Sequence, residues 1–269
     1  MIIVLSPAKT LEINKNFSNL PMTEPQFLEK SEILIKELKK YDEYSLASLM
    51  KTSPKLTALN KDRIEQWSKS LDNAFISIGA FKGEAYRGLD TGSYSIEELF
   101  YANDHLRILS GLYGVLRPFD GINFYRLEMG TKLKFKTYKD LYDYWGEEIQ
   151  ENIYKELIND DKILVNLASN EYFKSIECIK KYDDVTVITP TFKENRNGEY
   201  KVVTTKAKRA RGLMATFIII NKITEIDELK KFNYEGYEYD EELSNENEMI
   251  FTRENGWEER ILHNVEWEI

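Results

Sequence analysis

This chain of 269 residues has one cysteine and two histidines, and this scarcity excludes several kinds of site. With Cys178 alone, the chain cannot form an internal disulfide or a multi-cysteine zinc site, and a reducing, cytoplasmic location is expected. His105 and His263 are too few for a histidine-rich metal site, so we expect no metal site. No apolar run reaches the length of about 18 residues that suggests a membrane helix, and the apolar start MIIVL is too short for a signal peptide.

The common catalytic and phosphate-binding motifs are also missing. The sequence contains no Gly-x-x-x-x-Gly-Lys-[Ser/Thr], no Gly-x-Gly-x-x-Gly, no His-Glu-x-x-His and no Gly-x-Ser-x-Gly. A serine triad would need His105 or His263, and the surroundings of both favour structural or surface roles. The sequence therefore leaves the cofactor unknown and does not decide whether the protein is an enzyme.

Acidic residues are concentrated toward the C-terminal end of the chain. The net charge is −9, from 37 basic and 46 acidic residues. Residues 225–269 hold 15 acidic and four basic residues, whereas residues 1–224 hold 31 acidic and 33 basic ones. Two stretches, 126–139 and 201–211, are locally basic. The net charge argues against a nucleic-acid partner, whereas the two basic stretches leave open either a nucleic-acid surface or an ordinary solvated face.

The apolar pattern predicts one mixed α/β domain over residues 1–269, with strands and helices interleaved and an acid-rich region from about 225. Helix starts are indicated by capping patterns at Thr23, at Ser53-Pro54 and at Ser95. A hairpin around the loop 195–198 argues against a purely parallel sheet. The expected strands and the expected hairpin cover 1–5, 74–80, 133–135, 163–168 and 184–205, and a helix is expected at 206–221.

Four segments carry more polar residues or glycines than packing requires. The first follows the first strand, where Ser6 and Lys9 suit a phosphate or carboxylate, because ligands of open α/β sheets bind at the carboxyl ends of strands. In the second, Gly111 and Gly114 allow backbone amides to approach a phosphate, and Arg117 adds a cation. A solvated loop and an ordinary tight turn are the alternatives for these two segments.

The third segment places an acid beside a cation. Arg126 and Glu128 are two residues apart, so on an extended backbone their side chains share a face. They form either a structural ion pair or a positioned acid or base whose pKa the arginine holds down.

The fourth segment combines the end of the 163–168 strand with the start of the 206–221 helix. Asn166 and Glu171 follow the strand, and the helix begins with Lys206, Lys208 and Arg209. Cations at a helix N-terminus oppose the helix dipole, which favours a bound anion nearby. The alternative is a solvated basic face.

At these four segments the sequence resembles the YaaA family, named for a bacterial peroxide stress resistance protein. The motifs are SPAKT, LSGLYGVLRP with YRLEMG, NLASNEYF and KRARGLMA, in the order of the family. The resemblance extends from residue 1 to about residue 251, and the tail after residue 253 has no counterpart. It implies a cytoplasmic protein that helps bacteria survive hydrogen peroxide by limiting free iron and therefore oxidative damage to DNA.

The resemblance also implies a DNA-binding protein with a positively charged cleft and a helix–hairpin–helix element at 110–117. The net charge of −9 departs from what a strong DNA binder shows. No enzymatic reaction is settled for the family. The candidate cleft residues that the resemblance indicates are Lys9, Arg117, Arg126, Lys206, Lys208 and Arg209.

Two functions therefore remain open, a double-stranded DNA-binding stress protein and an enzyme acting on a nucleotide-like or other anionic small molecule. In the enzyme, Glu128 or Glu171 would serve as acid or base, because no histidine is expected there. An iron-sequestering role is opposed by the lack of a ligand cluster. We expect the four segments to converge in one cleft, and the sequence does not predict the oligomeric state.

Overall fold

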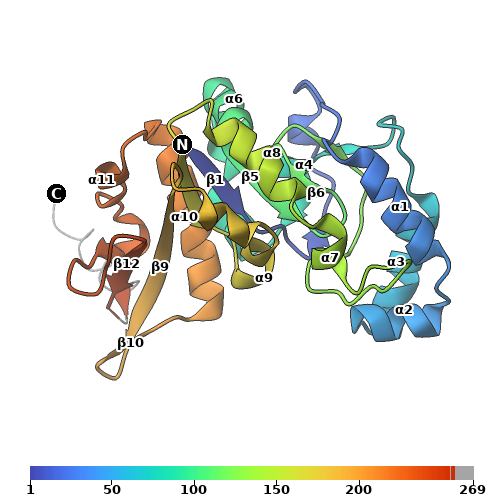
Figure 1. The fold of residues 1–269 in the computed structure, drawn as a ribbon. Coiled ribbons are helices and arrows are strands. Elements are labelled where there is room, and N and C mark those ends of the chain that lie inside the picture. Colours follow the sequence, from blue (N-terminus) through green and yellow to red (C-terminus); the bar gives the residue numbers. More distant parts are fainter. Residues whose placement is uncertain (255, 258–269) are drawn as a thin grey trace, which may run out of the picture.

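An eight-stranded mixed sheet forms the centre of the fold in a computed structural model that describes residues 1–254 and 256–257 (Figure 1). Its strands, in spatial order, are β11 (Glu238–Tyr239), β12 (Glu248–Arg253), β9 (Thr186–Arg196), β8 (Ile163–Leu167), β1 (Ile2–Leu5), β5 (Leu106–Ser110) and β6 (Gly114–Leu116), and β10 (Glu199–Lys201) pairs with β9. The pairs β5–β1, β1–β8, β8–β9 and β9–β12 are parallel, whereas β6, β10 and β11 are antiparallel to their neighbours. The predicted mixed α/β class with a mixed sheet is confirmed.

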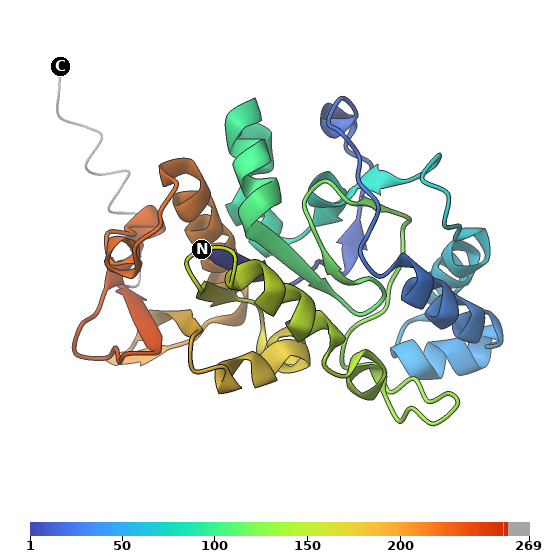
Figure 2. The same ribbon diagram turned by 45° about the horizontal axis from the view of Figure 1, so that its top comes forward.

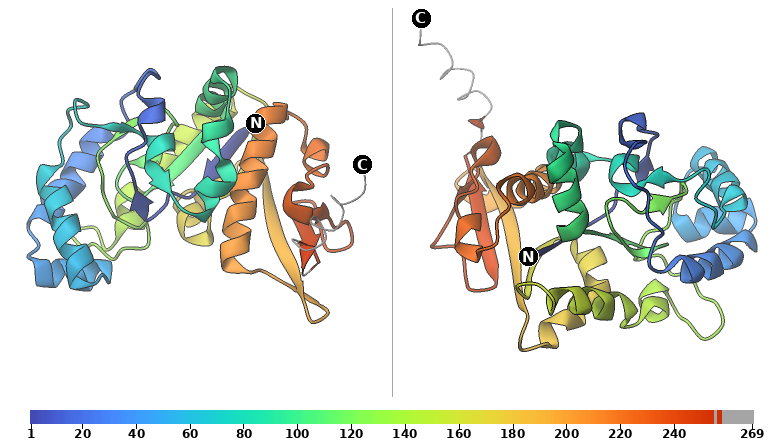
Figure 3. Two further views of the ribbon diagram at one scale, coloured as in Figure 1. Left: turned by 180° about the vertical axis from the view of Figure 1, so that it is seen from behind. Right: turned by 90° about the horizontal axis from the view of Figure 1, so that it is seen from above.

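The central strands are buried on both sides, which explains their continuous apolar sequence. All four residues of β1 are buried, and four of the five residues of β8 are buried. Figure 3 shows α6 (Ile96–His105) and α10 (Thr204–Asn221) on one face of the sheet, with α8 (Glu148–Leu157), α9 (Asn170–Phe173) and the 3₁₀ helix η3 (Lys174–Lys181) on the other. The predicted 206–221 helix is confirmed, and it starts two residues early.

A lobe of three helices lies at one end of the molecule, on the side of β6 (Figure 2). Its third helix begins with Pro54 after Ser53, as the sequence predicts. The lobe consists of α1 (Leu28–Lys39), α2 (Glu43–Met50) and α3 (Pro54–Gln66). The remaining short elements are β2 (Thr10–Leu11), η1 (Lys15–Phe17), β3 (Phe75–Ile76), α4 (Ser77–Ala80), β4 (Phe81–Lys82), α5 (Glu84–Leu89), η2 (Thr91–Ser93), β7 (Gly121–Ile122), α7 (Leu141–Trp145), α11 (Ile226–Leu229) and η4 (Tyr234–Gly236).

The segment 110–117 contains the turn and the second strand, β6, of a β-hairpin, so the expected helix–hairpin–helix at this place is wrong. Strands β5 and β6 pair antiparallel across it, with Ser110 opposite Gly114. The Ser110 hydroxyl accepts hydrogen bonds from the amides of Leu112 and Tyr113 at 3.3 and 3.0 Å, and these bonds close the turn. Gly114 adopts a positive φ of 71°, which glycine allows without strain.

Three other local predictions are wrong: the strands expected at 133–135 and 74–80 and the helix start expected at Thr23. Apolar alternation and capping patterns also occur where no such strand or helix start forms. In 133–135, Leu133 and Phe135 are buried and Lys134 is exposed, but the segment has only an isolated bridge to Tyr138. In 74–80, pairing is limited to β3, and the chain continues as α4. The Thr23 hydroxyl donates to an Asp120 carboxylate oxygen at 2.7 Å, and α1 starts later, at Leu28.

Two local predictions at chain reversals and helix starts are confirmed. Ser95 and Glu98 form the reciprocal capping box of α6. Strands β9 and β10 form the expected hairpin, and Asn197 and Gly198 at its turn both have positive φ. In the part of the chain that the structure describes, no helix is both long and apolar enough to cross a membrane.

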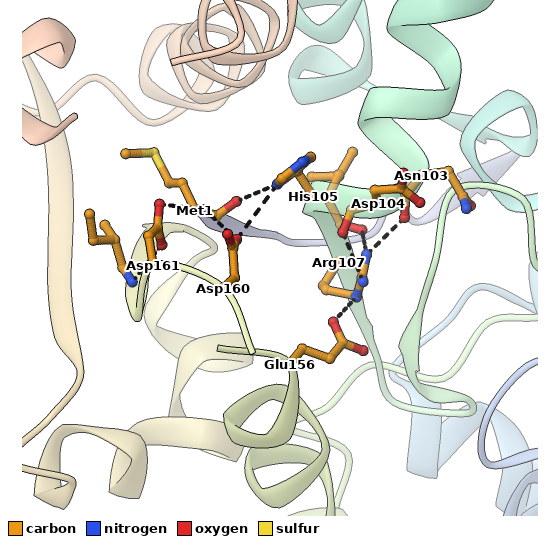
Figure 4. Close-up of polar contacts among 10 residues, drawn as sticks. Met1, Asn103, Asp104, His105, Arg107, Glu156, Asp160 and Asp161 are labelled. Carbon is orange, nitrogen blue, oxygen red and sulfur yellow. Dashed lines mark hydrogen bonds and ion pairs between the residues drawn. The ribbon is translucent and has the colours of Figure 1, made fainter. Parts of the chain in front are cut away.

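A group of paired charges lies at the amino ends of β1 and β5 (Figure 4). The Met1 amino group contacts the carboxylates of Asp160 and Asp161 at 2.5 and 2.6 Å. The buried Arg107 guanidinium donates to Glu156 at 2.6 Å and to the carbonyl oxygens of residues 103, 104 and 106. We call this group the amino-edge cluster, and it consists of Met1, His105, Arg107, Glu156, Asp160 and Asp161.

Candidate functional site

A cavity of about 660 Å³, here the first cavity, lies at the carboxyl ends of β1 and β8. The chain leaving β1 leads to β5 on one side of the pair, whereas the chain leaving β8 leads to β9 on the other. Such a point, where neighbouring strands send their connections in opposite directions, leaves a crevice in which α/β proteins bind ligands. The first cavity therefore occupies the position that the fold itself favours for a site.

Hydrogen bonds between the loops after β1 and β8 fix the shape of the first cavity. The Ser169 amide donates to the Ser6 hydroxyl oxygen at 2.8 Å, and the two hydroxyls lie 3.3 Å apart. The Tyr86 hydroxyl donates to the Ser6 carbonyl at 3.1 Å. Burial raises the pKa of Tyr86 well above its usual range, so its phenol stays protonated and remains a donor. Ser6, predicted from sequence as an anion-binding residue, lines the first cavity and accepts hydrogen bonds from Ser169 and Tyr86.

Close packing of α5 against α10 brings the basic helix to the first cavity. A Cβ on Gly212 would lie 1.8 Å from the Ala85 carbonyl oxygen, and a Cβ on Gly88 would lie 2.2 Å from the Arg209 carbonyl oxygen. The two backbones can approach this closely only because both positions are glycine. This contact sets Lys208 and Arg211 of α10 in the cavity wall.

Arg211 has no partner for its charge among the described residues. Among the residues that the structure describes, it is the one arginine with neither an ion pair nor a contact with an aromatic ring, and its guanidinium donates no hydrogen bond to any of them. Its guanidinium is partly buried, and burial lowers its pKa from the usual value. Of the other cations in this wall, Lys9 pairs with Glu128 and Lys82 pairs with Glu12. The first cavity therefore holds a partly desolvated cation for which residues 1–254 and 256–257 supply no ion pair.

A second cavity of about 590 Å³ lies next to the first, and Glu171 lines both. At their boundary, Glu128 accepts hydrogen bonds from Lys9 at 2.8 Å and from Arg126 at 3.0 Å. Glu171 accepts one from the Gly130 amide at 2.9 Å. Four residues that the sequence nominated from three separate segments are therefore brought together. The other residues of the second cavity include Lys51, Thr131 and Lys132.

Lys206 and Arg209 face a different side of α10. They line a separate cavity of about 490 Å³, and Arg209 forms an ion pair with Glu235 of the acid-rich region. Glu84 lines both this cavity and the first one. Lys208 is thus the only one of the three nominated helix cations that lies among the described lining residues of the first cavity.

Arg117 and Asn166 lie apart from both cavities. Arg117 lines a hollow of only about 60 Å³ and has Glu156 as its ion-pair partner at 3.5 Å. Asn166 is buried in β8, where its side-chain oxygen Oδ1 accepts from the Ala168 amide at 3.1 Å and its side-chain Nδ2 donates to the Thr189 hydroxyl oxygen at 3.3 Å. The expected single cleft is therefore only partly formed. Lys9 and Arg126 both donate to Glu128, whereas Arg117 and Lys206 line other cavities.

Gly111 and Gly114 lie in the hairpin that packs against the site residues. A Cβ on Gly111 would lie 2.3 Å from the Leu127 carbonyl oxygen, so glycine lets the hairpin touch the backbone that carries Arg126 and Glu128. Gly114 packs against the Trp145 ring. The binding of an anion by these two glycines stays a prediction.

Sequence reasoning left Arg211, Lys82, Tyr86 and Lys51 out of the nominated site. Arg211 follows Lys208 by three residues, and this helical spacing alone could have added it. The others come from β4, α5 and the end of α2, and no local pattern links them to the site. No group of three or more histidine, cysteine or carboxylate side chains is placed to hold a metal ion within residues 1–254 and 256–257.

Comparison with known proteins places the chain in a family. Residues 1–243 match the family described as "Peroxide stress protein YaaA". A "UPF0246 protein" of Clostridium botulinum (strain Alaska E43 / Type E3) is 60% identical over 257 residues, which cover 95% of this chain and 100% of that protein. Similar proteins of Clostridium beijerinckii and Colwellia psychrerythraea are 58% and 46% identical, and the matches cover 94% of this chain and 98% and 99% of theirs. The chain therefore belongs to the YaaA peroxide stress protein family, as its motifs predicted.

Proposed function

We propose that this protein acts in the cytoplasm during peroxide stress by binding DNA, and that the first cavity takes a backbone phosphate. The observation that carries the proposal is the partly buried guanidinium of Arg211, which forms no ion pair with any residue that the structure describes. A phosphate would supply the missing counter-ion, and hydrogen bonds between guanidinium and phosphate are among the stronger ones in proteins. Lys208, one turn earlier in α10, adds a second positive charge.

Phosphate contacts of this kind would hold DNA without reading its sequence. In the proposed role, bound DNA is shielded from radicals formed by iron and hydrogen peroxide, which limits iron-dependent damage. The family assignment supports the stress setting, and the cation-lined first cavity supports the contact with an anion.

Titration of a fluorescent DNA duplex across a salt series tests the proposal. The logarithm of the affinity should fall linearly with the logarithm of the salt concentration, because phosphate contacts release counter-ions. Arg211→Gln should weaken binding about 10- to 100-fold, the effect of losing a hydrogen bond to a charged group. Lys36→Gln is the control, because Lys36 is an exposed cation of α1 that lines neither cavity. Equal affinities of wild type and Arg211→Gln at every salt concentration would overturn the proposal.

A second candidate function is an enzyme or receptor for a nucleotide-like anionic small molecule, and the size of the first cavity favours it. Its volume of about 660 Å³ falls within the range of about 300–1,000 Å³ that is usual for small-molecule sites. Glu128 is held between two cations, whereas the Gly130 amide is the only donor to the Glu171 carboxylate in the described part of the chain. Glu171 is therefore the freer acid or base, as the sequence led us to expect.

Two substitutions test the acid or base role. Glu171→Gln and Glu128→Gln preserve side-chain volume, so the fold should remain, and survival of a deletion strain in peroxide is the readout. In the enzyme, at least one variant fails to protect. If both variants protect as well as wild type, neither glutamate is an acid or base in the process.

A further inference from the structure

We infer that the first and second cavities form one bipartite site for single-stranded nucleic acid, with one nucleotide in each cavity. The inference rests on the proposed function, since it needs the first cavity to bind phosphate. It adds a second binding region and names the form of the ligand.

The two cavities share a wall that a ligand can cross. Glu171 lines both, and the ion pair of Lys9 with Glu128 lies at their boundary. The Lys9 side chain is 60% exposed, and ion pairs of exposed side chains contribute little free energy because water competes for both charges. A strand that passes from one cavity to the other therefore displaces only a weak contact.

The second cavity has its own donors for an anion. Lys51 and Lys132 line it, and neither has an ion-pair partner among the described residues. Arg126 donates to Glu128 through one nitrogen, while its buried Nε has no hydrogen-bond partner. An unsatisfied buried donor is unfavourable, and an anionic oxygen near Arg126 would relieve it. Each cavity is thus equipped for a phosphate independently of the other.

The second cavity also has an apolar surface on which a base could lie. Leu49 is partly buried, Met50 and Leu127 are buried, and all three line this cavity. Its volume of about 590 Å³ is again that of a small-molecule site, so each cavity accommodates about one nucleotide. Bases of a duplex are stacked and cannot enter such cavities, whereas a single strand can turn its bases outward.

The experiment compares thymidine 5′-monophosphate with the dinucleotide pTpT by calorimetric titration. Wild type should bind pTpT at least about tenfold more tightly than the monophosphate, because the second phosphate gains charged contacts. The double variant Lys51→Gln/Lys132→Gln should lose this advantage and bind the monophosphate as before. Arg211→Gln should weaken the binding of both ligands. Lys134→Gln is the matched control, because Lys134 is exposed, lies two residues from Lys132 and lines neither cavity.

The outcomes separate this inference from the proposed function. If pTpT and the monophosphate bind equally, or if the double variant retains the advantage of pTpT, the bipartite site is wrong while Arg211-dependent binding stands. If a duplex binds through Arg211 and neither thymidine ligand binds, the bipartite site is again wrong. If Arg211→Gln changes no affinity for any of these ligands, the proposed function fails and the bipartite site fails with it.

Discussion

Charged residues gather at both ends of the central strands, here called the amino edge and the carboxyl edge of the sheet, but they are paired differently at the two ends. At the amino edge, Figure 4 shows the Met1 amino group and the Arg107 guanidinium in direct contact with carboxylates. At the carboxyl edge, Arg211 stands in the first cavity with no such partner among the described residues. Both guanidinium groups have their pKa lowered by burial.

The difference shows that a cluster of charges is not in itself a sign of a site. Arg107 satisfies its donors with Glu156 and three backbone carbonyls, so its surroundings explain its burial completely. Arg211 is partly buried, and no described residue gives its guanidinium a comparable partner, although burying an unpaired charge is unfavourable. The comparison predicts that charges at the amino edge stabilise the fold, whereas Arg211 serves a ligand.

The largest effect is expected from Glu156→Ala at the amino edge. The variant leaves the buried Arg107 without its carboxylate, and losing one partner of a buried pair costs about 3–5 kcal/mol. The three remaining carbonyl contacts of Arg107 place the expected loss near the lower end, about 3 kcal/mol. Urea denaturation measures it. Glu151→Ala, an exposed position of the same helix, is the control, and a loss of similar size in both variants would contradict the role of the pair.

A smaller loss is expected from Gly212→Ala, which tests how the carboxyl edge is built. The new Cβ would meet the backbone of Ala85 at 1.8 Å, so α5 and α10 must move apart. Overpacking of this kind costs about 1–3 kcal/mol, and Arg211 should also shift and lose affinity for phosphate. At Gly92 a Cβ meets nothing within 4 Å, so Gly92→Ala is the control for both readouts. Unchanged stability in Gly212→Ala would mean that the helix contact is looser than the structure shows.

Much of the fold could be predicted because its main strands carry a strong local signal. The apolar runs of β1 and β8 and the hairpin of β9 and β10 are visible in the sequence. The segment 133–135 alternates apolar and polar residues like a strand, but it has only an isolated bridge to Tyr138. Its pattern therefore indicates contact of Leu133 and Phe135 with the core and not a strand. The helix–hairpin–helix expected at 110–117 rests on the family resemblance, whereas in the structure this segment carries β6, which pairs with β5.

The candidate site was predicted less completely than the fold. Lys9, Arg126, Glu128 and Glu171 meet because loops from different strands converge, which the strand-end rule anticipates. The cavity-lining residues at the start of α10 were harder to predict. Lys206, Lys208, Arg209 and Arg211 are all basic, and the sequence does not show which face of the helix lines the first cavity. The close contact at Gly88 and Gly212 decides this, and it joins residues more than a hundred positions apart.

A pH-dependent difference is expected from Asp120→Asn, close to Arg107 and Arg117. Burial raises the pKa of Asp120, although the Thr23 hydroxyl and the Arg117 amide both donate to it at 2.7 Å. The folded state therefore disfavours the charged form relative to the unfolded chain. The contribution of Asp120 to stability is fully present below the unfolded pKa of about 3.9, and it is lost as pH rises through the higher folded value.

Urea denaturation of both proteins between about pH 3 and pH 7 measures this effect. Asparagine does not titrate, so the free energy of unfolding of wild type should fall relative to that of Asp120→Asn as pH rises. A relative gain of wild type over this range would show that the hydrogen bonds outweigh burial and that the pKa is lowered.

The smallest effect on stability is expected from Arg211→Met. This variant tests whether Arg211 serves a ligand, in contrast to Arg107, which stabilises the fold. Methionine has a similar length and carries no charge, so the variant removes the unfavourable burial of an unpaired guanidinium. We expect the free energy of unfolding to stay within about 1 kcal/mol of wild type or to rise, as often happens when a functional residue is replaced. Phosphate-dependent binding should be lost in the same variant, whereas Lys36→Met should change neither property. A destabilisation comparable with that of Glu156→Ala would mean that Arg211 supports the fold as Arg107 does, and the two edges would then not differ in kind.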